Sequence, residues 1–314
     1  MTTIDSVLRR ALDDRSGELV LTLDSAFQGL PDTAHGGSVL AAFDALAGLG
    51  PPREVRGVYH KRVPLGVPLA LKRVRVDAAL ECQLLGRDGT LLVDGRVAPA
   101  ADGDHRATGP GPLLDHASNR PAVGRFTSVT PGNAQKQRVE KRARARSAVV
   151  AHPLPVSRAC FACGVDNALG LRAQLEFDDA EVRGTWKPHE PFRTAGDTLT
   201  TAALTALCDE AAFWVGALAT GEAGMTTDLA VTLHRAVPFD GTLTITGARA
   251  AARPQADPRY WDTEVAARTG DAVLVASARI TFVAVRGAAR ALVRGLLAIN
   301  DPAVIARVFP AYAR

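Results

Sequence analysis

Apolar and polar positions follow two different periods in the first third of the chain. Residues 18–24 (ELVLTLD) alternate between apolar and polar side chains, which predicts a strand. Residues 36–49 carry apolar side chains at helical spacing between a glycine pair and Gly50-Pro51-Pro52, which indicates a helix. Further strands are predicted at 55–63, 67–81, 83–87 and 90–98.

A similar succession returns in the second half of the chain. An apolar helix is predicted at residues 200–219. The strands predicted around it are 171–177, 181–186, 226–236, 241–252, 258–269 and 272–284. Each half therefore combines one long apolar helix with an antiparallel sheet, and the predicted fold class is α+β.

Individual residues also recur at matched spacings in the two halves. In each half, a phenylalanine and an aspartate lie 17 positions apart, and a polar residue lies eight positions after the phenylalanine. These residues are Phe27, His35 and Asp44 in the first half, and Phe192, Thr200 and Asp209 in the second. Downstream, each half has a histidine four residues before a proline, at His60 and His234. We interpret the chain as a duplication of one unit.

Residues 101–158 differ from both halves. They contain GPGP, TPGN and the basic run KQRVEKRARARS, with little periodicity, which is typical of a linker, and a short helix is predicted at 134–147. The predicted organisation is therefore a unit at 1–100, a linker at 101–158, a second unit at 159–286 and a helical tail at 287–314. The basic run is either solvated or contributes to binding an anionic ligand.

Composition narrows the class of protein. Of 314 residues, 47% are hydrophobic and 22% are charged, which is normal for a soluble globular chain. The formal net charge of +4 does not indicate nucleic-acid binding. No uninterrupted apolar stretch of about 20 residues predicts a membrane span, and the charged N-terminus does not resemble a signal peptide. We expect a cytoplasmic protein.

Both predicted helices contain carboxylates among apolar residues, where burial of an unpaired charge would be costly. Asp44 lies inside the first predicted helix, after His35-Gly36-Gly37, so it is paired, solvated in a cleft or used in chemistry. A salt bridge from Asp44 to an arginine is an equal alternative to a functional role. Asp209 and Glu210 lie in a helix that is apolar on nearly every face, so at least one of them is expected to line a cavity.

These motifs resemble a known family. Phe-Gln-Gly followed by His-Gly-Gly and Asp is similar to the hotdog-fold thioesterases of the phenylacetate-pathway type. The stretch CFACGVDNALGLRAQLEF resembles the opening of single-unit relatives, although Ala168 stands where proline is usual. The resemblance implies two hotdog units, each a long helix wrapped by a curved antiparallel sheet, packed as an intramolecular pseudo-dimer.

The resemblance also implies a site and a reaction, hydrolysis of an acyl-CoA or acyl-carrier-protein thioester. Backbone N–H groups at the helix start, at Gly36 and Gly37, would polarise the thioester carbonyl. Asp209 or Glu210 from the other unit would act as general base or nucleophile. Gln28 and Gly29 would contact the substrate. Apart from CoA as part of the substrate, no cofactor is implied.

A second site is implied with the roles of the units exchanged. Asp44 would face the helix start at Thr200, Thr201 and Ala202. Because this half lacks His-Gly-Gly, the second site is expected to be degenerate or altered. Pairs of such chains often assemble further, so a homodimer is possible.

Several alternatives stay open at this point. His35 either caps the helix or takes part in acid–base chemistry. The protein could instead be a hydratase, dehydratase or cyclase, or a non-catalytic acyl-ligand binder. The motif Cys160-x-x-Cys163 has no second cysteine pair, and with only His152 and His189 considered as partners, we predict no metal site.

Overall fold

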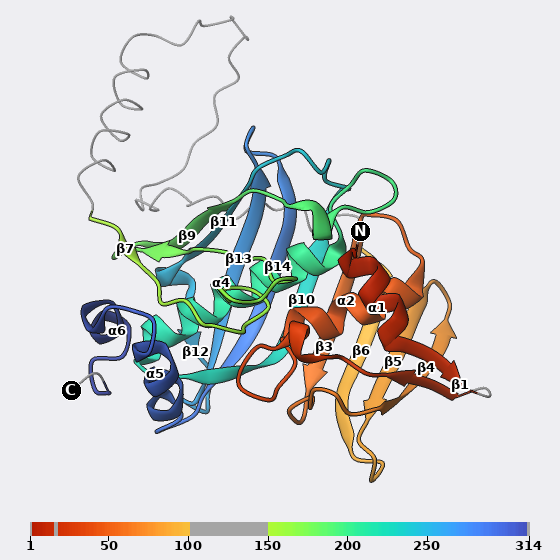
Figure 1. Ribbon diagram of the computed structural model, residues 1–314, viewed down its shortest axis with the longest axis horizontal. Helices are drawn as coiled ribbons and strands as arrows, with labels where there is room; N and C mark the ends of the chain where they lie inside the picture. Colours follow the sequence, from red (N-terminus) through yellow and green to blue (C-terminus); the bar gives the residue numbers. More distant parts are fainter. Residues whose placement is uncertain (1, 16–17, 101–149, 313–314) are drawn as a thin grey trace, which may run out of the picture. The chain divides into compact units, whose positions relative to one another are not determined.

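The two halves of the chain contribute to one antiparallel sheet (Figure 1). In the described residues this sheet has 14 strands, and their order is β1-β2-β4-β5-β6-β3-β10-β14-β13-β11-β9-β8-β7, with β12 paired to β13. The strands of the first half are β1 (Leu12–Arg15), β2 (Glu18–Leu21), β3 (Arg53–Tyr59), β4 (Leu69–Val76), β5 (Ala79–Leu85) and β6 (Leu91–Pro99). Those of the second half are β7 (His152–Pro153), β8 (Glu176–Phe177), β9 (Glu181–Trp186), β10 (Gly224–Leu233), β11 (Leu243–Ala248), β12 (Arg253–Pro254), β13 (Tyr260–Thr269) and β14 (Leu274–Ala284).

The structure, a computed structural model, describes residues 2–15, 18–100 and 150–312. Residues 1–100 and 152–314 belong to one compact unit, so both predicted units lie in a single body. Most of the predicted linker at 101–158, including the short helix predicted at 134–147, lies outside the described residues.

The halves of the sheet meet where β3 pairs with β10. The register places Arg53 opposite Leu233 and Val58 opposite Asp228. This junction brings the end of β3 beside the start of β10, and it joins six strands of the first half to the strands of the second half. Side chains on these two strands can therefore contribute to one site.

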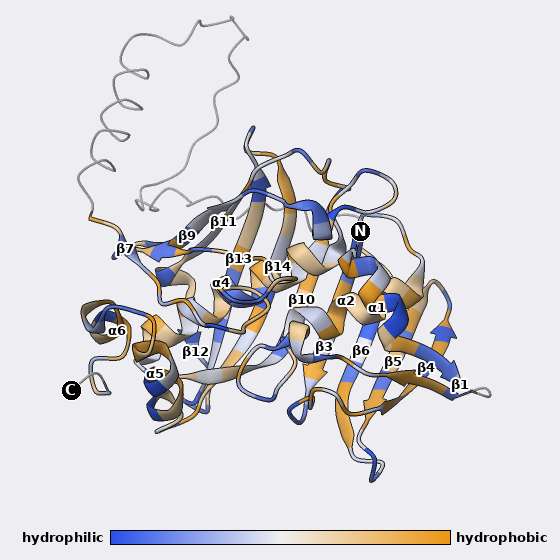
Figure 2. Cartoon of the chain, in the orientation of Figure 1, coloured by the Kyte–Doolittle hydropathy of each residue, from blue (hydrophilic) through white to orange (hydrophobic). Residues whose placement is uncertain are grey.

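Each half carries one central apolar helix. Helix α2 (Gly36–Ala47) follows the N-cap residue His35 and ends at Gly48, whose φ of +65° is in the left-handed region that favours glycine. Helix α4 (Thr201–Thr220) ends in the same way at Gly221, with a φ of +68°. Figure 2 shows apolar residues along both helices and along the strands behind them.

Helix α4 is long and apolar enough to cross a membrane, but 83% of its most apolar window is buried inside the protein. It packs on strands β9, β10, β11, β13 and β14, whereas α2 packs on β3, β5 and β6. The two helices also contact each other. Helix α4 is thus a core helix of this fold, as its uniform apolar pattern predicts.

The segments before α2 and α4 have matching local structure. A short 3₁₀ helix precedes each of them, η1 (Ser25–Phe27) and η2 (Glu190–Phe192), and both end in a fully buried phenylalanine. Asp32 and Asp197 both have positive φ, at 57° and 58°. The spacing noticed in the sequence therefore corresponds to two loops of the same geometry.

Some predicted boundaries were wrong. The strand expected at 67–81 is interrupted: β4 ends at Val76, Asp77 turns the chain with a φ of 53°, and β5 begins at Ala79. Of the strand expected at 171–177, only Glu176–Phe177 pairs in the sheet. An alternation of apolar and polar residues can continue through a short turn between two strands, which explains why β4 and β5 were predicted as one strand.

The ends of the chain add three helices to the described structure. Helix α1 (Ile4–Ala11), which the sequence analysis did not predict, packs on α2. Helices α5 (Ala289–Leu297) and α6 (Pro302–Val308) lie in the segment for which a helical tail was predicted. The ring of Phe309, directly after α6, lies 6.3 Å from the ring of Trp214 in α4, so the tail packs near the end of the core helix.

Candidate functional site

The start of α2 is held against the middle of α4 by glycine. A Cβ added to Gly37 would lie 2.5 Å from the backbone carbon of Thr205 and 2.6 Å from Ala206, so no larger residue fits without moving a helix. The hydroxyl of Thr205 donates to the carbonyl of Gly37 at 2.7 Å. The sequence analysis assigned this glycine to substrate approach; the structure shows that it also permits the close contact of the two helices.

Asp209 of α4 faces this helix start directly. Its Oδ2 accepts a hydrogen bond of 3.1 Å from the backbone N–H of Gly37 and lies 3.2 Å from Nδ1 of His35. Its Oδ1 accepts a hydrogen bond of 2.7 Å from the hydroxyl of Thr226 on β10. Of the two acids that the sequence left open, Asp209 is therefore the one that contacts Gly37.

His35 lies between the two acids of α4. Burial lowers the pKa of its imidazole, but Asp209 and Glu210 oppose this effect and raise the pKa to about 9. The ring is therefore a cation at neutral pH, with a proton on both nitrogens. The N–H of Gly37 lies 3.2 Å from Nδ1, the position of a helix cap, and 3.1 Å from Oδ2 of Asp209; with Nδ1 protonated, Nδ1–H donates to Asp209 and the Gly37 N–H is satisfied by the same carboxylate oxygen.

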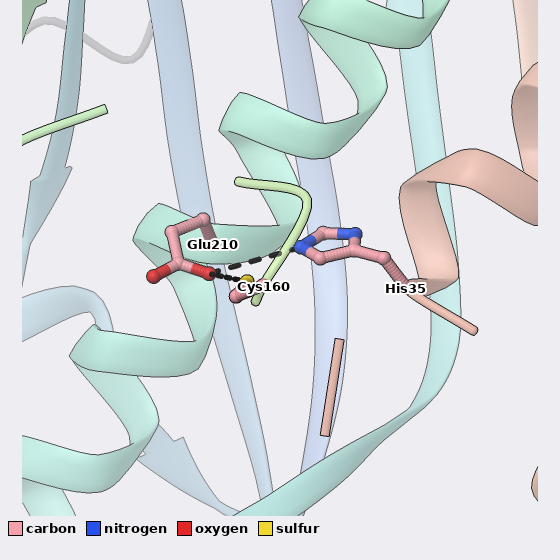
Figure 3. A group of neighbouring side chains, drawn as sticks. All are labelled: His35, Cys160 and Glu210. Atoms are coloured by element: carbon pink, nitrogen blue, oxygen red, sulfur yellow. Dashed lines mark hydrogen bonds and ion pairs between the residues drawn. The ribbon is translucent and has the colours of Figure 1, made fainter. Parts of the chain in front are cut away.

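Glu210 has a different set of neighbours from Asp209. The indole Nε1–H of Trp214 donates to its Oε1 at 2.8 Å. Its Oε2 lies 3.7 Å from Nε2 of His35 and 3.9 Å from Sγ of Cys160 (Figure 3). Burial raises the pKa of Glu210, but the charge and hydrogen-bonding capacity of His35 outweigh this, and the pKa is lowered. Glu210 is thus ionised and points away from Gly37.

The loop that carries Cys160 and Cys163 is folded tightly against this site. The N–H of Gly164 donates to the carbonyl of Cys160, and a Cβ on Gly164 would lie only 2.2 Å from that oxygen. Asn167 ties the loop to the first half through a hydrogen bond of 2.8 Å to the carbonyl of Ala26. The sequence showed the Cys-x-x-Cys motif but not its location beside Glu210.

The two thiols affect each other. A hydrogen bond from Cys163 lowers the pKa of Cys160 in spite of burial, and the pKa of Cys163 is raised well above its usual range. The other candidate metal ligands of the sequence analysis lie elsewhere: His152 is on β7, and the ring of His189 contacts the carbonyl of Gly170.

A cavity of about 1060 Å³ opens onto these groups. It is lined by Gln28, Gly29, His35 and Gly36 from the first half, and by Cys160, Asp209 and Glu210 from the second. Its apolar lining includes Phe213, Trp214, Val283, Leu292 and Leu296. Such a volume, mostly apolar with a few convergent polar groups, is typical of a small-molecule site.

Two residues at the strand junction complete the polar lining, and the sequence analysis did not identify either of them. Tyr59, near the end of β3, donates from its hydroxyl to the carbonyl of Gly36 at 2.7 Å. Thr226, near the start of β10, holds Asp209. No local motif marks them, because their role depends on the pairing of β3 with β10.

The second predicted site is built differently. Asp44 accepts two hydrogen bonds from Arg53, at 2.6 and 2.7 Å, and a third of 2.7 Å from the hydroxyl of Thr201. The hydroxyl of Thr200 donates to Asp5 of α1 at 2.5 Å. The cavity here, which Ala202 also lines, measures only about 290 Å³.

Asp44 therefore faces Thr201, as expected, but its carboxylate is engaged by a bidentate arginine. The salt bridge that the sequence analysis left open is present. Arg53 and Asp5 were not identified from the sequence. The guanidinium of Arg53 and the hydroxyl of Thr201 occupy both oxygens of this carboxylate. The geometry does not support Asp44 as a base.

The chain was compared with family models, curated proteins and solved structures. No family model matches the chain, and no curated protein matches its sequence. Among solved structures, a candidate thioesterase II from Thermobifida fusca is similar over 91% of this chain and 98% of its own, with a TM-score of 0.56 and 16% identity.

Two other solved structures agree with it. A hot dog fold protein from Alicyclobacillus acidocaldarius is 14% identical over 90% of this chain and 97% of its own, with a TM-score of 0.54. A tesB protein from Mycobacterium avium is 13% identical over 90% of this chain and all of its own, with a TM-score of 0.51. These similarities establish that the chain has the hotdog fold.

Proposed function

We propose that this protein hydrolyses the thioester of an acyl-CoA or acyl-carrier-protein substrate. The observation that carries the proposal is the contact of 3.1 Å between the N–H of Gly37 and the carboxylate of Asp209. It joins a backbone donor at a helix start to a buried acid that lines a large cavity. The name of the similar structure from T. fusca, a candidate thioesterase II, supports the same reaction.

In this proposal the substrate carbonyl replaces Asp209 as the acceptor of the Gly37 N–H. That donor and the positive end of α2 stabilise the oxyanion that forms when the carbonyl is attacked. Tyr59 holds the carbonyl of Gly36 at 2.7 Å and so fixes the peptide plane that presents the N–H.

Asp209 activates water as general base. It takes a proton as the water oxygen bonds to the carbonyl carbon; the carbon–sulfur bond then breaks, and the thiolate leaves with that proton. Thr226 and the His35 cation hold both carboxylate oxygens in place. Because the substrate carbonyl takes over the Gly37 N–H, Asp209 Oδ2 is left free to accept a proton from water, and we assign Asp209 the role of base and not of nucleophile. His35 is a positioning residue for this carboxylate.

The proposal includes two hotdog units paired within the chain, with boundaries at residues 1–100 and 159–286. Helices α2 and α4 would be their central helices, and the β3–β10 pairing their contact. Only one of the two interfaces would be active, because Arg53 neutralises Asp44 at the other. The cavity would hold the acyl group against its apolar wall, while Lys61, Arg62 and Arg158 at the same cavity suit an anionic carrier.

The test is release of free thiol from a panel of short, medium, long and aromatic acyl-CoAs and from acyl-carrier-protein thioesters. Turnover that is lost in Asp209→Asn and kept in Asp44→Asn supports the proposed site. If no thioester in the panel releases thiol with the folded wild-type protein, the proposal is wrong.

A further inference from the structure

Three chemically different side chains converge in the cavity from separate parts of the chain. His35 comes from the turn before α2, Cys160 from the tight loop of the second half and Glu210 from α4 (Figure 3). One nitrogen, one sulfur and one carboxylate oxygen of this group all lie within 4.8 Å of one another, and all three residues are buried.

The spacing of these atoms is close to that of ligands around a shared cation. Nε2 of His35 and Oε2 of Glu210 are 3.7 Å apart, which exceeds the length of an N–H···O hydrogen bond. Sγ of Cys160 lies 3.9 Å from the same oxygen. In a tetrahedral zinc site with bonds of about 2.0 to 2.3 Å, neighbouring ligand atoms are roughly 3.3 to 3.7 Å apart.

Each side chain is also oriented by a second partner, which leaves the converging atom available. Asp209 lies 3.2 Å from Nδ1 of His35, so Nε2 is the nitrogen directed at the cluster. Trp214 holds Oε1 of Glu210, which leaves Oε2. Carboxylate–histidine contacts of this kind orient the ligands of protein metal sites.

The sulfur of Cys160 is also oriented by a second partner. The N–H of Ala162, two residues after Cys160, donates to Sγ at 3.3 Å. This bond stabilises a thiolate and fixes its direction. Cys163 adds a second buried sulfur beside Cys160 and Glu210. The tight turn requires Gly164, since a Cβ there would collide with the carbonyl of Cys160.

The charge of the buried groups permits a divalent cation in this position. Asp209 and Glu210 are both buried, and within the cluster only the His35 cation opposes them. A bound dication displaces the proton on Nε2 of His35 and the proton of the Cys160 thiol, which are released to solvent. The dication, the two carboxylates, the thiolate and the neutral imidazole together carry a net charge of −1, the same as the two carboxylates and the His35 cation without metal.

We propose that His35, Cys160 and Glu210 form a binding site for a divalent transition-metal cation of the zinc class, with a further coordination position open to the cavity. Mixed imidazole, thiolate and carboxylate ligands select this class over magnesium and calcium, which prefer oxygen. The sequence analysis predicted no metal site because it paired the cysteines only with His152 and His189. This inference goes beyond the proposed hydrolysis and does not depend on it.

The test uses the full-length protein, reduced with a thiol-free reductant, freed of metal by a chelator and titrated with Co²⁺ as a spectroscopic probe. We expect one equivalent to bind, with a sulfur-to-cobalt charge-transfer band and the visible bands of a four- or five-coordinate centre. Zn²⁺ should displace the cobalt and abolish both. Absence of a charge-transfer band at one equivalent would overturn the proposal.

Variants separate this site from other cysteines. Cys160→Ser should abolish the charge-transfer band and Glu210→Gln should weaken Zn²⁺ binding, whereas Cys82→Ala, which removes a buried thiol of β5, should leave both unchanged. Asp209→Asn should weaken binding by about 10- to 100-fold. A charge-transfer band that persists in Cys160→Ser, with folding verified by circular dichroism, also contradicts the proposal. No substrate enters these measurements, so failure of the hydrolysis proposal would be seen separately.

Discussion

The backbone N–H of Gly37 donates a hydrogen bond of 3.1 Å to Asp209 Oδ2, although the two residues are 172 positions apart. This contact exists because a glycine lets the start of α2 approach the backbone of α4. It brings a helix N-terminus of one half and a buried carboxylate of the other half together in one cavity.

Replacing Asp209 with asparagine should lower kcat by roughly 100- to 10,000-fold, because the amide cannot take a proton from water. The measurement is thiol release from the best acyl-CoA of the panel. Asp178→Asn is the matched control, since both aspartates are 6% exposed but Asp178 bonds to Arg183. Equal losses of activity in the two folded variants would contradict the assignment.

The assignment of Asp209 as base makes a second, isotopic prediction. During multiple turnovers in ¹⁸O-labelled water, label should enter the released acid and not the Asp209 side chain. Mass spectrometry of the peptide that contains Asp209 measures this directly. Label in that peptide would show that the carboxylate attacks the thioester itself.

Gly37→Ala should destabilise the protein by about 1 to 3 kcal/mol, because its Cβ would overlap the backbone of α4. Urea denaturation measures the change in the free energy of unfolding. Gly50→Ala is the control, since a Cβ there has no neighbour within 4 Å in the described structure. A Gly37→Ala variant as stable as Gly50→Ala would mean that the helices are not in this contact.

The His35 cation should make stability depend on pH. Its pKa is about 9 in the folded protein against 6.5 for the free side chain, so the folded state binds the proton more tightly. This stabilisation is fully present below about pH 6.5 and is lost as the pH rises through 9. Denaturation of metal-free protein from pH 6 to 10 should show the decline in wild type and not in His35→Gln. Parallel curves for the two proteins would refute the raised pKa.

The pair of Asp44 and Arg53 should be structural. Asp44→Asn leaves a mostly buried guanidinium without its counter-charge, which costs about 3 to 5 kcal/mol. Asp94→Asn, which breaks an exposed pair with His60, should cost less than about 1 kcal/mol. The activity of folded Asp44→Asn should stay close to that of wild type. A large loss of kcat without loss of stability would instead restore Asp44 as a catalytic residue.

Cys160 should be the most reactive of the four cysteines in metal-free protein. Its pKa is lowered and it lines the cavity, whereas burial raises the pKa values of Cys82 and Cys208 to about 12. Limited alkylation with iodoacetamide followed by peptide mass spectrometry should label Cys160 first. Preferential labelling of Cys82 would contradict this order.

Periodicity was sufficient for the elements that bury a continuous apolar surface. The helices at 36–47 and 201–220 and most strands of both halves lie where the pattern places them, because burial of one face imposes the period. The matched spacing from Phe27 to Asp44 and from Phe192 to Asp209 likewise reflects local geometry. Short elements escaped prediction: α1 has too few turns to show a clear period, and the turn at Asp77 lies inside a continuous strand pattern.

Two helices with acids in their apolar faces, the first of them started by a glycine pair, could be predicted from the pattern of residues. Long-range packing sets which acid meets Gly37, brings Arg53 to Asp44, and brings Cys160 beside His35 and Glu210. The physical reason is that local spacing fixes which face of an element a side chain occupies. The partner across that face depends on the pairing of β3 with β10 and on the contact of α2 with α4, which join residues far apart in the chain.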